Sequence, residues 1–399
     1  MSCLFPIFPL LGLPEDLVKL IIKLSKCKVY DLCLVNKRFN DNCKIIKIVS
    51  NKKFPKLSDE NVKGLVNLTK LDLESTSLLT DEGIKNLNNL RSLKINENVT
   101  TISNLSIKTL TNLTCLNINY NTIITDEAIE KLNKLTKLRI AGTNIKISEN
   151  FSSLTHLDIS KNGAIINEDI KNMTNLTVLV LSFNDNISSI QNFTNLTFLS
   201  LFHNDKITDD EIRYLTKLTG IELGHNNTIT DLGIKSLTNL TSIKLNSNTQ
   251  ITENGLMNLT NITHLSLANN YNINNEFLYN MKNLKSLDIC LENNITNMGL
   301  MKLTNLTFLD ISANEVITDN GIKNLTNLLK LKVSENDLIT NDGIKNLTNL
   351  TYIDPSYSNI TVEGLKFLTN LKQFCIWDGT AGETAGKLLT YLQNLKIVK

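Results

Sequence analysis

The residues that could carry out chemistry are few in this sequence and lie far apart. Its 399 residues include four histidines and seven cysteines. His203 and His225 stand at equivalent places in adjacent segments, but two imidazoles without a third ligand make a poor metal site. The spacing forces no Ser, His and Asp together, and no pair of carboxylates, so it indicates no catalytic centre. We therefore expect no catalytic residues and no metal.

A segment near the C-terminus comes close to a phosphate-binding loop. Residues 381–387 read AGETAGK, which nearly matches the glycine-rich pattern, but Leu388 stands where a hydroxyl would have to hold magnesium. The surrounding sequence does not read as a strand, a loop and then a helix. The sequence therefore predicts neither a nucleotide nor any other cofactor.

Composition narrows the possible partners and the compartment. The net charge is +2, so no overall field favours nucleic acid or an acidic membrane. No run approaches the ~20 apolar residues of a membrane span. The cysteines are scattered without a C-x-x-C pair, which favours a reducing compartment over a disulfide framework. The first twelve residues are apolar but lack the basic residues that open a secretory signal. We expect a cytoplasmic protein, with the nucleus as an alternative.

Most of the chain consists of copies of one short unit, which is clearest in residues 306–327. Its first half reads L-x-x-L-x-I-x-x-N, and the alternation of Leu309 and Ile311 has the period of a half-buried strand. Its second half opens with Thr318 and Asp319, which favour the start of a helix. One strand and one helical turn cannot bury their own apolar edge, so the unit must stack on its copies.

Fifteen copies follow one another over residues 57–399, most of them 22 residues apart. This pattern resembles the leucine-rich-repeat family. The resemblance implies an α/β solenoid of about fifteen repeats, with a parallel sheet on the concave side and short helices on the convex side. The first strand residues of the copies are Leu68, Leu90, Leu113, Leu135, Leu154, Leu176, Leu196, Leu218, Leu240, Ile262, Leu284, Leu306, Leu328, Leu350 and Leu371.

Several details of the solenoid follow from the repeat. The asparagine nine residues into most copies, from Asn98 to Asn336, should lie inside and bond the turn backbones of adjacent repeats. Glu292 occupies one of these places and fits poorly there, so the turn should bulge. Two copies are short and should lack the helix, at residues 144–150 and 185–192. Residues 382–395 predict a longer helix that caps the C-terminal end.

The first 56 residues have a different pattern. They carry 11 Lys and Arg against 4 Asp and Glu, and their apolar residues recur at helical spacing. Pro14, Glu15 and Asp16 suit the first turn of a helix. Residues 1–56 therefore predict a small helical module ahead of the repeats.

This module resembles the F-box, the short helical domain that docks on the linker subunit of cullin-based SCF ubiquitin ligases. The match covers roughly residues 10–45, through LPEDL at residues 13–17 and DLCLVNKRF at residues 31–39. It departs from the family in a compact middle and in Phe39, where a tryptophan is usual. The alternative is a plain cap for the first repeat. By the resemblance, the residues that would contact the linker subunit are Leu13, Pro14, Leu17, Leu20, Ile21, Leu24, Leu34 and Val35.

Two groups of apolar residues interrupt the otherwise polar concave positions. In the first group, the residues come from neighbouring repeats whose strands lie ~4.8 Å apart, so their side chains should form one patch. Exposed patches of this kind usually mark interaction sites, although strands also favour such residues for their own sake. The first group is Val178, Val180, Phe183, Phe198, Phe202 and His203, and the second is Phe308, Tyr352, Tyr357 and Trp377.

These features lead to one main hypothesis and two alternatives. In the main one, the F-box-like helices dock the SCF linker subunit and cullin complex, and the concave face recruits an unknown target protein for ubiquitination. The protein would act by proximity and not by catalysis. The repeats also resemble those of bacterial surface proteins in their Leu-Thr-Asn-Leu-Thr segment, so a recognition or adhesion protein without a ligase is the first alternative. A cytosolic scaffold or inhibitor is the second.

Overall fold

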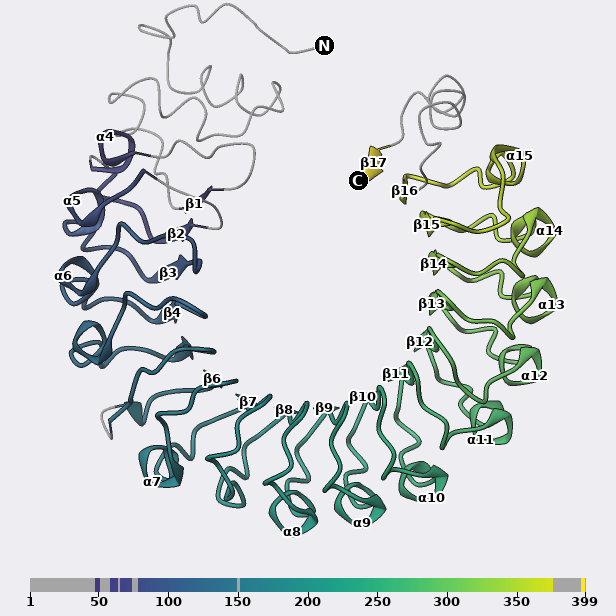
Figure 1. The fold of residues 1–399 in the computed structure, drawn as a ribbon, viewed down its shortest axis with the longest axis horizontal. Helices are drawn as coiled ribbons and strands as arrows, with labels where there is room; N and C mark the ends of the chain where they lie inside the picture. The colour runs from purple at the N-terminus through teal and green to yellow at the C-terminus, as the bar shows by residue number, and fades with distance from the viewer. Residues whose placement is uncertain are drawn as a thin grey trace, which may run out of the picture. The chain divides into compact units, whose positions relative to one another are not determined.

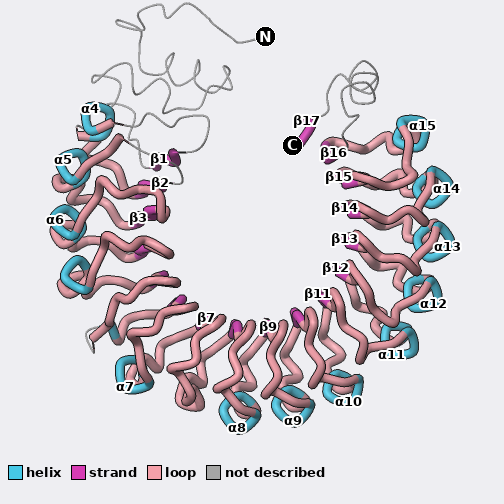
Figure 2. Tube along the Cα trace, viewed as in Figure 1, coloured by secondary structure: helices cyan, strands magenta, loops and turns pink. Residues whose placement is uncertain are grey.

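The computed structural model describes residues 47–50, 58–63, 65–73, 78–148, 151–375 and 396–398. The chain divides into two compact units. Unit 1 comprises residues 1–158 and 162–165, and unit 2 comprises residues 159–161 and 166–399. Both units are built from the same kind of repeat, with strands on one side and short helices on the other (Figure 1, Figure 2). We call these two sides the strand face and the helix face.

Unit 1 carries the elements before residue 159. They are β1 (Lys47–Ser50), α4 (Asp59–Val62), β2 (Lys70–Leu73), α5 (Asp81–Ile84), β3 (Ser92–Ile95), α6 (Asn104–Ile107), β4 (Cys115–Asn117), the 3₁₀ helix η1 (Asp126–Ala128), β5 (Lys137–Arg139) and β6 (His156–Asp158).

Unit 2 carries the elements after it. The helices are α7 (Asn167–Ile170), α8 (Asp209–Ile212), α9 (Asp231–Ile234), α10 (Glu253–Leu256), α11 (Asn275–Tyr279), α12 (Asn297–Leu300), α13 (Asp319–Ile322), α14 (Asn341–Ile344) and α15 (Val362–Leu365). The strands are β7 (Val178–Val180), β8 (Phe198–Ser200), β9 (Gly220–Glu222), β10 (Ser242–Lys244), β11 (His264–Ser266), β12 (Ser286–Asp288), β13 (Phe308–Asp310), β14 (Lys330–Lys332), β15 (Tyr352–Asp354), β16 (Gln373–Cys375) and β17 (Lys396–Val398).

The strands of each unit pair in parallel with their neighbours in sequence, and their central leucines or isoleucines lie in register. Ile221, Ile243 and Leu265 are aligned partners in β9, β10 and β11, and all three are buried. Strands β2–β16 supply one strand for each of the fifteen predicted repeats. The structure therefore confirms the solenoid of leucine-rich repeats, with its core of leucine and isoleucine between the two faces.

A second set of contacts joins the repeats on the helix face. Thr230 caps α9 by accepting a hydrogen bond from the Leu232 amide. Its own amide and hydroxyl donate to the two carboxylate oxygens of Asp209 in the preceding helix, at 2.8 and 2.6 Å. Threonine thus does two tasks, because it ends the loop and links neighbouring helices. The predicted helix start at Thr318 and Asp319 is confirmed, since Thr318 caps α13 in the same way.

The asparagine ladder forms as predicted where the repeat is regular. Asn248 is 1% exposed and uses both ends of its amide. Its nitrogen donates to the carbonyls of Leu223 and Asn226 in the preceding repeat, at 2.8 and 3.0 Å. Its oxygen accepts from the amides of Gln250 and Ile251, at 3.0 and 2.9 Å. A buried amide that is fully bonded stabilises the turn, whereas an unbonded one would be costly.

The ladder departs from the prediction at two turns. Asn98 is exposed, and Val99 is buried in its place, because the repeat from Leu90 to Leu113 contains one residue more than the usual 22. At the other turn Glu292 is exposed and Asn293 lies inside, with its side-chain nitrogen 2.8 Å from the Ile289 carbonyl. The prediction for Asn98 was therefore wrong, and the expected bulge at Glu292 is confirmed.

The shortened repeats also behave as expected in the described residues. Residues 144–148 and 185–192 contain no helix. In the second of these segments, Glu211 of α8 takes over part of the missing bonding. Its carboxylate accepts from the backbone amides of Ile190 and Gln191, at 2.6 and 3.1 Å. A longer acidic side chain thus replaces a helical turn.

The predicted modules at the two ends lie largely outside the described residues. This holds for residues 1–46, which include most of the F-box-like module, and for the predicted cap helix at residues 382–395. Strand β1 pairs in parallel with β2, and β17 pairs with β16. Within the described ranges, no helix is both long and apolar enough to cross a bilayer.

Candidate recognition surface

One backbone feature recurs at the edge of the strand face. In the described ranges, eleven non-glycine residues adopt the left-handed conformation, and each directly precedes a ladder position. This conformation is disfavoured for side chains in general and most of all for β-branched ones. None of the eleven is Val, Ile or Thr. They are Tyr120, Lys161, Phe183, His203, His225, Ser247, Asn269, Leu291, Ala313, Glu335 and Tyr357.

Three consecutive members of this series form a stack of rings in unit 2. Phe183 and His203 stack with ring centroids 4.6 Å apart, and His203 and His225 stack at 4.3 Å with only 7° between their planes. The backbone sets this spacing, since the amide of His203 donates to the Gly224 carbonyl of the next repeat at 3.1 Å. Lys161 extends the series, with its ammonium 4.5 Å from the Phe183 ring. We call Phe183, His203 and His225 the ring column.

Phe202 lies against the edges of the ring column. Its ring meets Phe183, His203 and His225 in edge-on geometry, at 5.4, 4.8 and 5.4 Å. The ring also lies over Gly224 of the next repeat, where a Cβ would come within 2.8 Å of it. We call Phe202 and the ring column together the aromatic cluster. Its rings hold one another and the neighbouring backbone in fixed positions.

Phe198, four residues before Phe202, makes the same kind of contact. A Cβ on Gly220 would lie 3.0 Å from the Phe198 ring. Phe198 is aligned with Val178 across strands β7 and β8. The two glycines therefore make room for two phenylalanines of the preceding repeat, and any larger residue would displace them.

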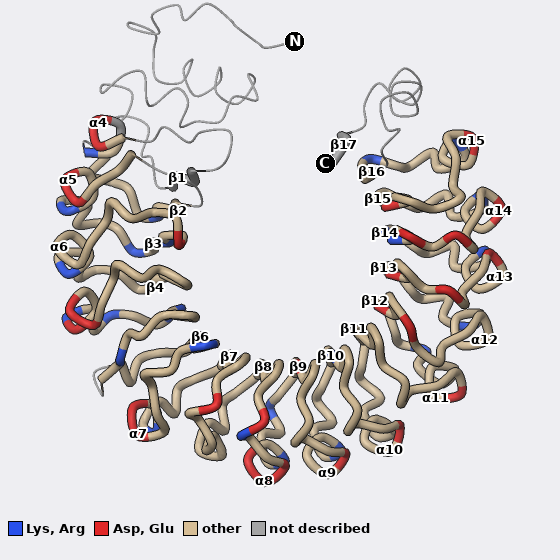
Figure 3. Tube along the Cα trace, viewed as in Figure 1, with Lys and Arg blue, Asp and Glu red and all other residues tan. Residues whose placement is uncertain are grey.

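The aromatic cluster is weakly charged. Strands β7 and β8 contain no charged residue, in contrast to β12–β14 (Figure 3). Burial and the neighbouring charge of His203 lower the pKa of His225, so that protonating His225 is unfavourable. Phe183 is nevertheless 42% exposed. The cluster is an accessible apolar surface on a backbone that is hydrogen-bonded between repeats, which is the usual chemistry of a protein-binding hot spot.

The structure brings the first predicted group of residues together. Val178, Val180, Phe198 and Phe202 are half-buried, Phe183 and His203 are exposed, and none lies in the core. The prediction omitted four participants, namely His225, Lys161, Gly220 and Gly224. The 22-residue spacing of His203 and His225 was the signal for the first of these. No sequence pattern marked the two glycines as supports for the phenylalanine rings.

The second predicted group is not a cluster. Phe308 and Tyr352 are separated by Lys330, which is aligned with both across β13, β14 and β15. Tyr357 is exposed, and no ring contact joins these three side chains within the described residues. Trp377 lies outside the described residues. Phe308, Tyr352 and Tyr357 therefore do not form the predicted cluster, because Lys330 of β14 lies between the first two.

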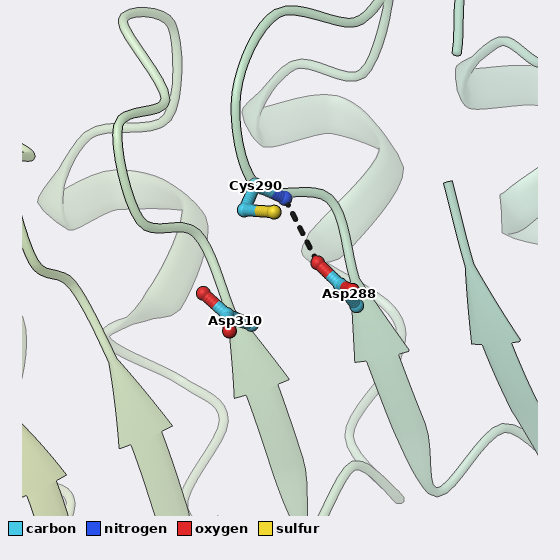
Figure 4. A group of neighbouring side chains, drawn as sticks. All are labelled: Asp288, Cys290 and Asp310. Carbon is cyan, nitrogen blue, oxygen red and sulfur yellow. Dashed lines mark hydrogen bonds between the residues drawn. The ribbon is translucent and has the colours of Figure 1, made fainter. Parts of the chain in front are cut away.

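A group of possible metal ligands occurs on strands β12 and β13 and in the turn after β12. Donor atoms of Asp288, Cys290 and Asp310 lie within 4.8 Å of one another (Figure 4). Burial, with the charge of Asp288 adding to it, raises the pKa of the Cys290 thiol to about 12, so the thiol stays protonated. Lys332 supplies a cation 3.1 Å from Asp310, and the Ser266 hydroxyl donates to Asp288 at 2.7 Å. These partners already satisfy the carboxylates, so we assign no metal to the group.

The predicted contacts to a ligase linker cannot be placed on the structure. Leu13, Pro14, Leu17, Leu20, Ile21, Leu24, Leu34 and Val35 all lie outside the described residues.

Comparison with known proteins identifies the repeat. The model of the family described as "Leucine Rich repeat" matches residues 65–87, 109–132, 214–237, 302–325 and 324–347. No match to an F-box family was found. A search of curated proteins found no match.

Three solved structures are similar to the chain. An internalin (inlF) from Listeria monocytogenes is 24% identical, over 87% of this chain and 92% of that one, with a TM-score of 0.42. Internalin C2 from the same organism is 31% identical, over 47% of this chain and 83% of that one, with a TM-score of 0.39. The TLR13–ssRNA13 complex is 20% identical over 86% of this chain and 61% of that one, with a TM-score of 0.53. Only the last superposition is close enough to support a common fold, and it shows nothing more than the fold.

Proposed function

Because the chain is a leucine-rich-repeat protein, we propose that it is a non-catalytic recognition protein that binds a protein ligand on the strand face of unit 2. The observation that supports this is the aromatic cluster, an exposed apolar surface whose rings are fixed by the backbone spacing. Fixed aromatic side chains lose little conformational entropy on binding, so they suit the centre of an interface. This proposal follows from the repeats alone and does not require a ubiquitin ligase.

Affinity capture with the full chain tests this proposal. Phe183→Ser and Phe202→Ser should each remove the bound protein partner, since each variant removes part of the apolar surface. Tyr357→Ser is a matched control, because Tyr357 has the same left-handed backbone and is 55% exposed but lies outside the cluster. The proposal is wrong if the same partners are recovered with all three variants and with the unaltered protein.

The finer proposal, docking on the SCF linker subunit, rests on the sequence of residues 10–45 alone. In that case the protein would recruit its ligand for ubiquitination in the cytoplasm or nucleus. Capture of the linker subunit by the full chain, abolished by Leu17→Asp with Ile21→Asp, would support it. Capture of the aromatic cluster's ligand without any cullin subunit would favour the simpler recognition protein.

A further inference from the structure

In unit 2, six of the seven helices from α9 to α15 follow one rule at their third residue. In α9, α10 and α12–α15 this residue is glycine, and a Cβ there would lie 2.1–2.6 Å from an oxygen of the preceding helix's first residue. That first residue is Asp or Asn, and its oxygen accepts the amide of the capping threonine, as Asp231 does from Thr252 at 2.8 Å. Neighbouring helices can therefore approach closely only if the third residue has no side chain.

Helix α11 breaks this rule. Its third residue is Phe277, which is only 7% exposed. The first residue of α10 is Glu253, longer by one methylene than the usual Asp, and its carboxylate reaches the Asn274 amide at 3.1 Å. Every other consecutive pair of helices from α8 to α15 packs closely, whereas α10 and α11 do not. Phe277 therefore separates the two helices, and Glu253 spans the wider gap.

The separation leaves an open groove of about 540 Å³ on the helix face between α10 and α11. A groove of this volume is within the range of ligand sites and holds more than a single side chain. Its apolar walls are Met257, Ile262, Phe277 and Met281, and Met257 is 62% exposed. Methionine side chains adapt to differently shaped apolar partners.

The charges around this groove are predominantly negative. Glu253 and Glu276 line it together with Lys282, and none of the three forms an ion pair within the described residues. Two carboxylates against one ammonium favour a positively charged occupant. The apolar walls require that the occupant also carry apolar side chains.

We propose that the groove between α10 and α11 is a second docking site, which binds a short segment of a protein partner with apolar side chains between lysines or arginines. The apolar side chains lie against Met257, Phe277 and Met281, and the basic ones pair with Glu253 and Glu276. This site is on the helix face, apart from the aromatic cluster of the strand face. A ligand on one face leaves the other accessible.

Fluorescence anisotropy of the full chain with a labelled octapeptide of alternating leucine and lysine tests this proposal. This peptide should bind at least about tenfold more tightly than the matched leucine–glutamate peptide, because each misplaced charge costs about 1 kcal/mol or less and several act together. Glu276→Lys should weaken the leucine–lysine peptide about fivefold to tenfold. Equal binding of the two peptides would contradict the proposed charge preference.

Two further variants test the groove itself. Met257→Lys should weaken binding about tenfold, whereas Met301→Lys, at the same C-cap position of α12, should leave it unchanged. Glu253→Asp with Phe277→Gly restores the regular rule and should remove binding while the chain stays folded by circular dichroism. Retained binding in that double variant, or equal loss with Met301→Lys, would overturn the proposal. Phe202→Ser should not change peptide binding, so this result is independent of the ligand on the strand face.

Discussion

Two stretches of the strand face of unit 2 share one backbone and differ in almost every exposed side chain. Strands β7–β9 carry the aromatic cluster, and strands β12–β14 carry the group of Asp288, Cys290, Asp310 and Lys332. In the first stretch, the rings contact one another, and Phe183 and His203 stay exposed. In the second, acids and a lysine pair within the protein. The charged stretch already has partners of its own, and the aromatic stretch has apolar surface left for another molecule.

This difference shows which residues the fold determines and which it leaves free. Buried leucine, isoleucine or valine fills the interior of both stretches, and a ladder asparagine follows five of their six strands, because every repeat must fill the same interior. The outward residues and the residue before each ladder position vary. Binding specificity therefore depends on positions that contribute little to the fold itself.

The largest expected effect is on the reactivity of Cys290 in the charged stretch. Burial and the nearby carboxylates raise its pKa to about 12, against about 8.5 for a free thiol. At pH 8 its alkylation by iodoacetamide should be about a thousandfold slower than that of free cysteine, because the thiolate is the reactive form. Peptide mapping by mass spectrometry measures the rate. A rate within tenfold of free cysteine would contradict the placement of Cys290 against Asp288.

The next largest effect is a decrease in the free energy of unfolding, which should be equal in the two stretches. Asn226→Ala and Asn314→Ala should each lower the free energy of unfolding by about 2–4 kcal/mol, since each removes the partners of buried backbone groups. Urea unfolding followed by circular dichroism measures this change. Asn98→Ala, at an exposed position, should change it by less than about 0.5 kcal/mol. A large difference between Asn226→Ala and Asn314→Ala would mean that the scaffold is not the same in both stretches.

A smaller decrease in the free energy of unfolding should distinguish the two stretches. Phe202→Ala should lower the free energy of unfolding by about 1–2 kcal/mol, because it removes three ring contacts. Phe308→Ala, also half-buried but without a ring neighbour in the described residues, should cost less in the same urea experiment. Equal costs would mean that the ring contacts of the aromatic cluster contribute nothing to stability.

The smallest effect is a pH dependence confined to the aromatic stretch. Burial and His203 lower the pKa of His225 below its usual 6.5, so the unfolded chain binds a proton more readily than the folded one. The contribution of His225 to stability is complete above pH 6.5 and is lost as the pH falls through the folded pKa. His225→Phe should flatten this fall in urea midpoint between about pH 6.5 and pH 5. His156, whose pKa is also lowered by burial, remains in both proteins, so the difference between the two curves isolates His225.

Much of this fold could be predicted from the sequence because the repeat fixes the register. A spacing of 22 residues places equivalent residues side by side in adjacent repeats, which is why the sequence puts His203 and His225 at equivalent places. The asparagine ladder followed in the same way. The ladder prediction failed at Asn98, since one inserted residue moves the ladder position by one place without changing the residue types around it.

The rest of the site depends on details that the repeat pattern does not contain. The left-handed turn and the contact of Phe202 with Gly224 are properties of three-dimensional packing. The second predicted group failed because residue type alone does not show that Lys330 lies between Phe308 and Tyr352. Phe277 was visible in the sequence as a departure from glycine. Its effect became clear only from the looser packing of α10 against α11.

The left-handed residue before each ladder position limits how this protein can change over evolutionary time. Valine, isoleucine and threonine are disfavoured there, and none occurs at the eleven places. New binding surface along this edge has to come from aromatic side chains or from long side chains that are not branched at Cβ. A descendant could exchange one residue in each repeat and acquire a new ligand, while its interior stayed as it is.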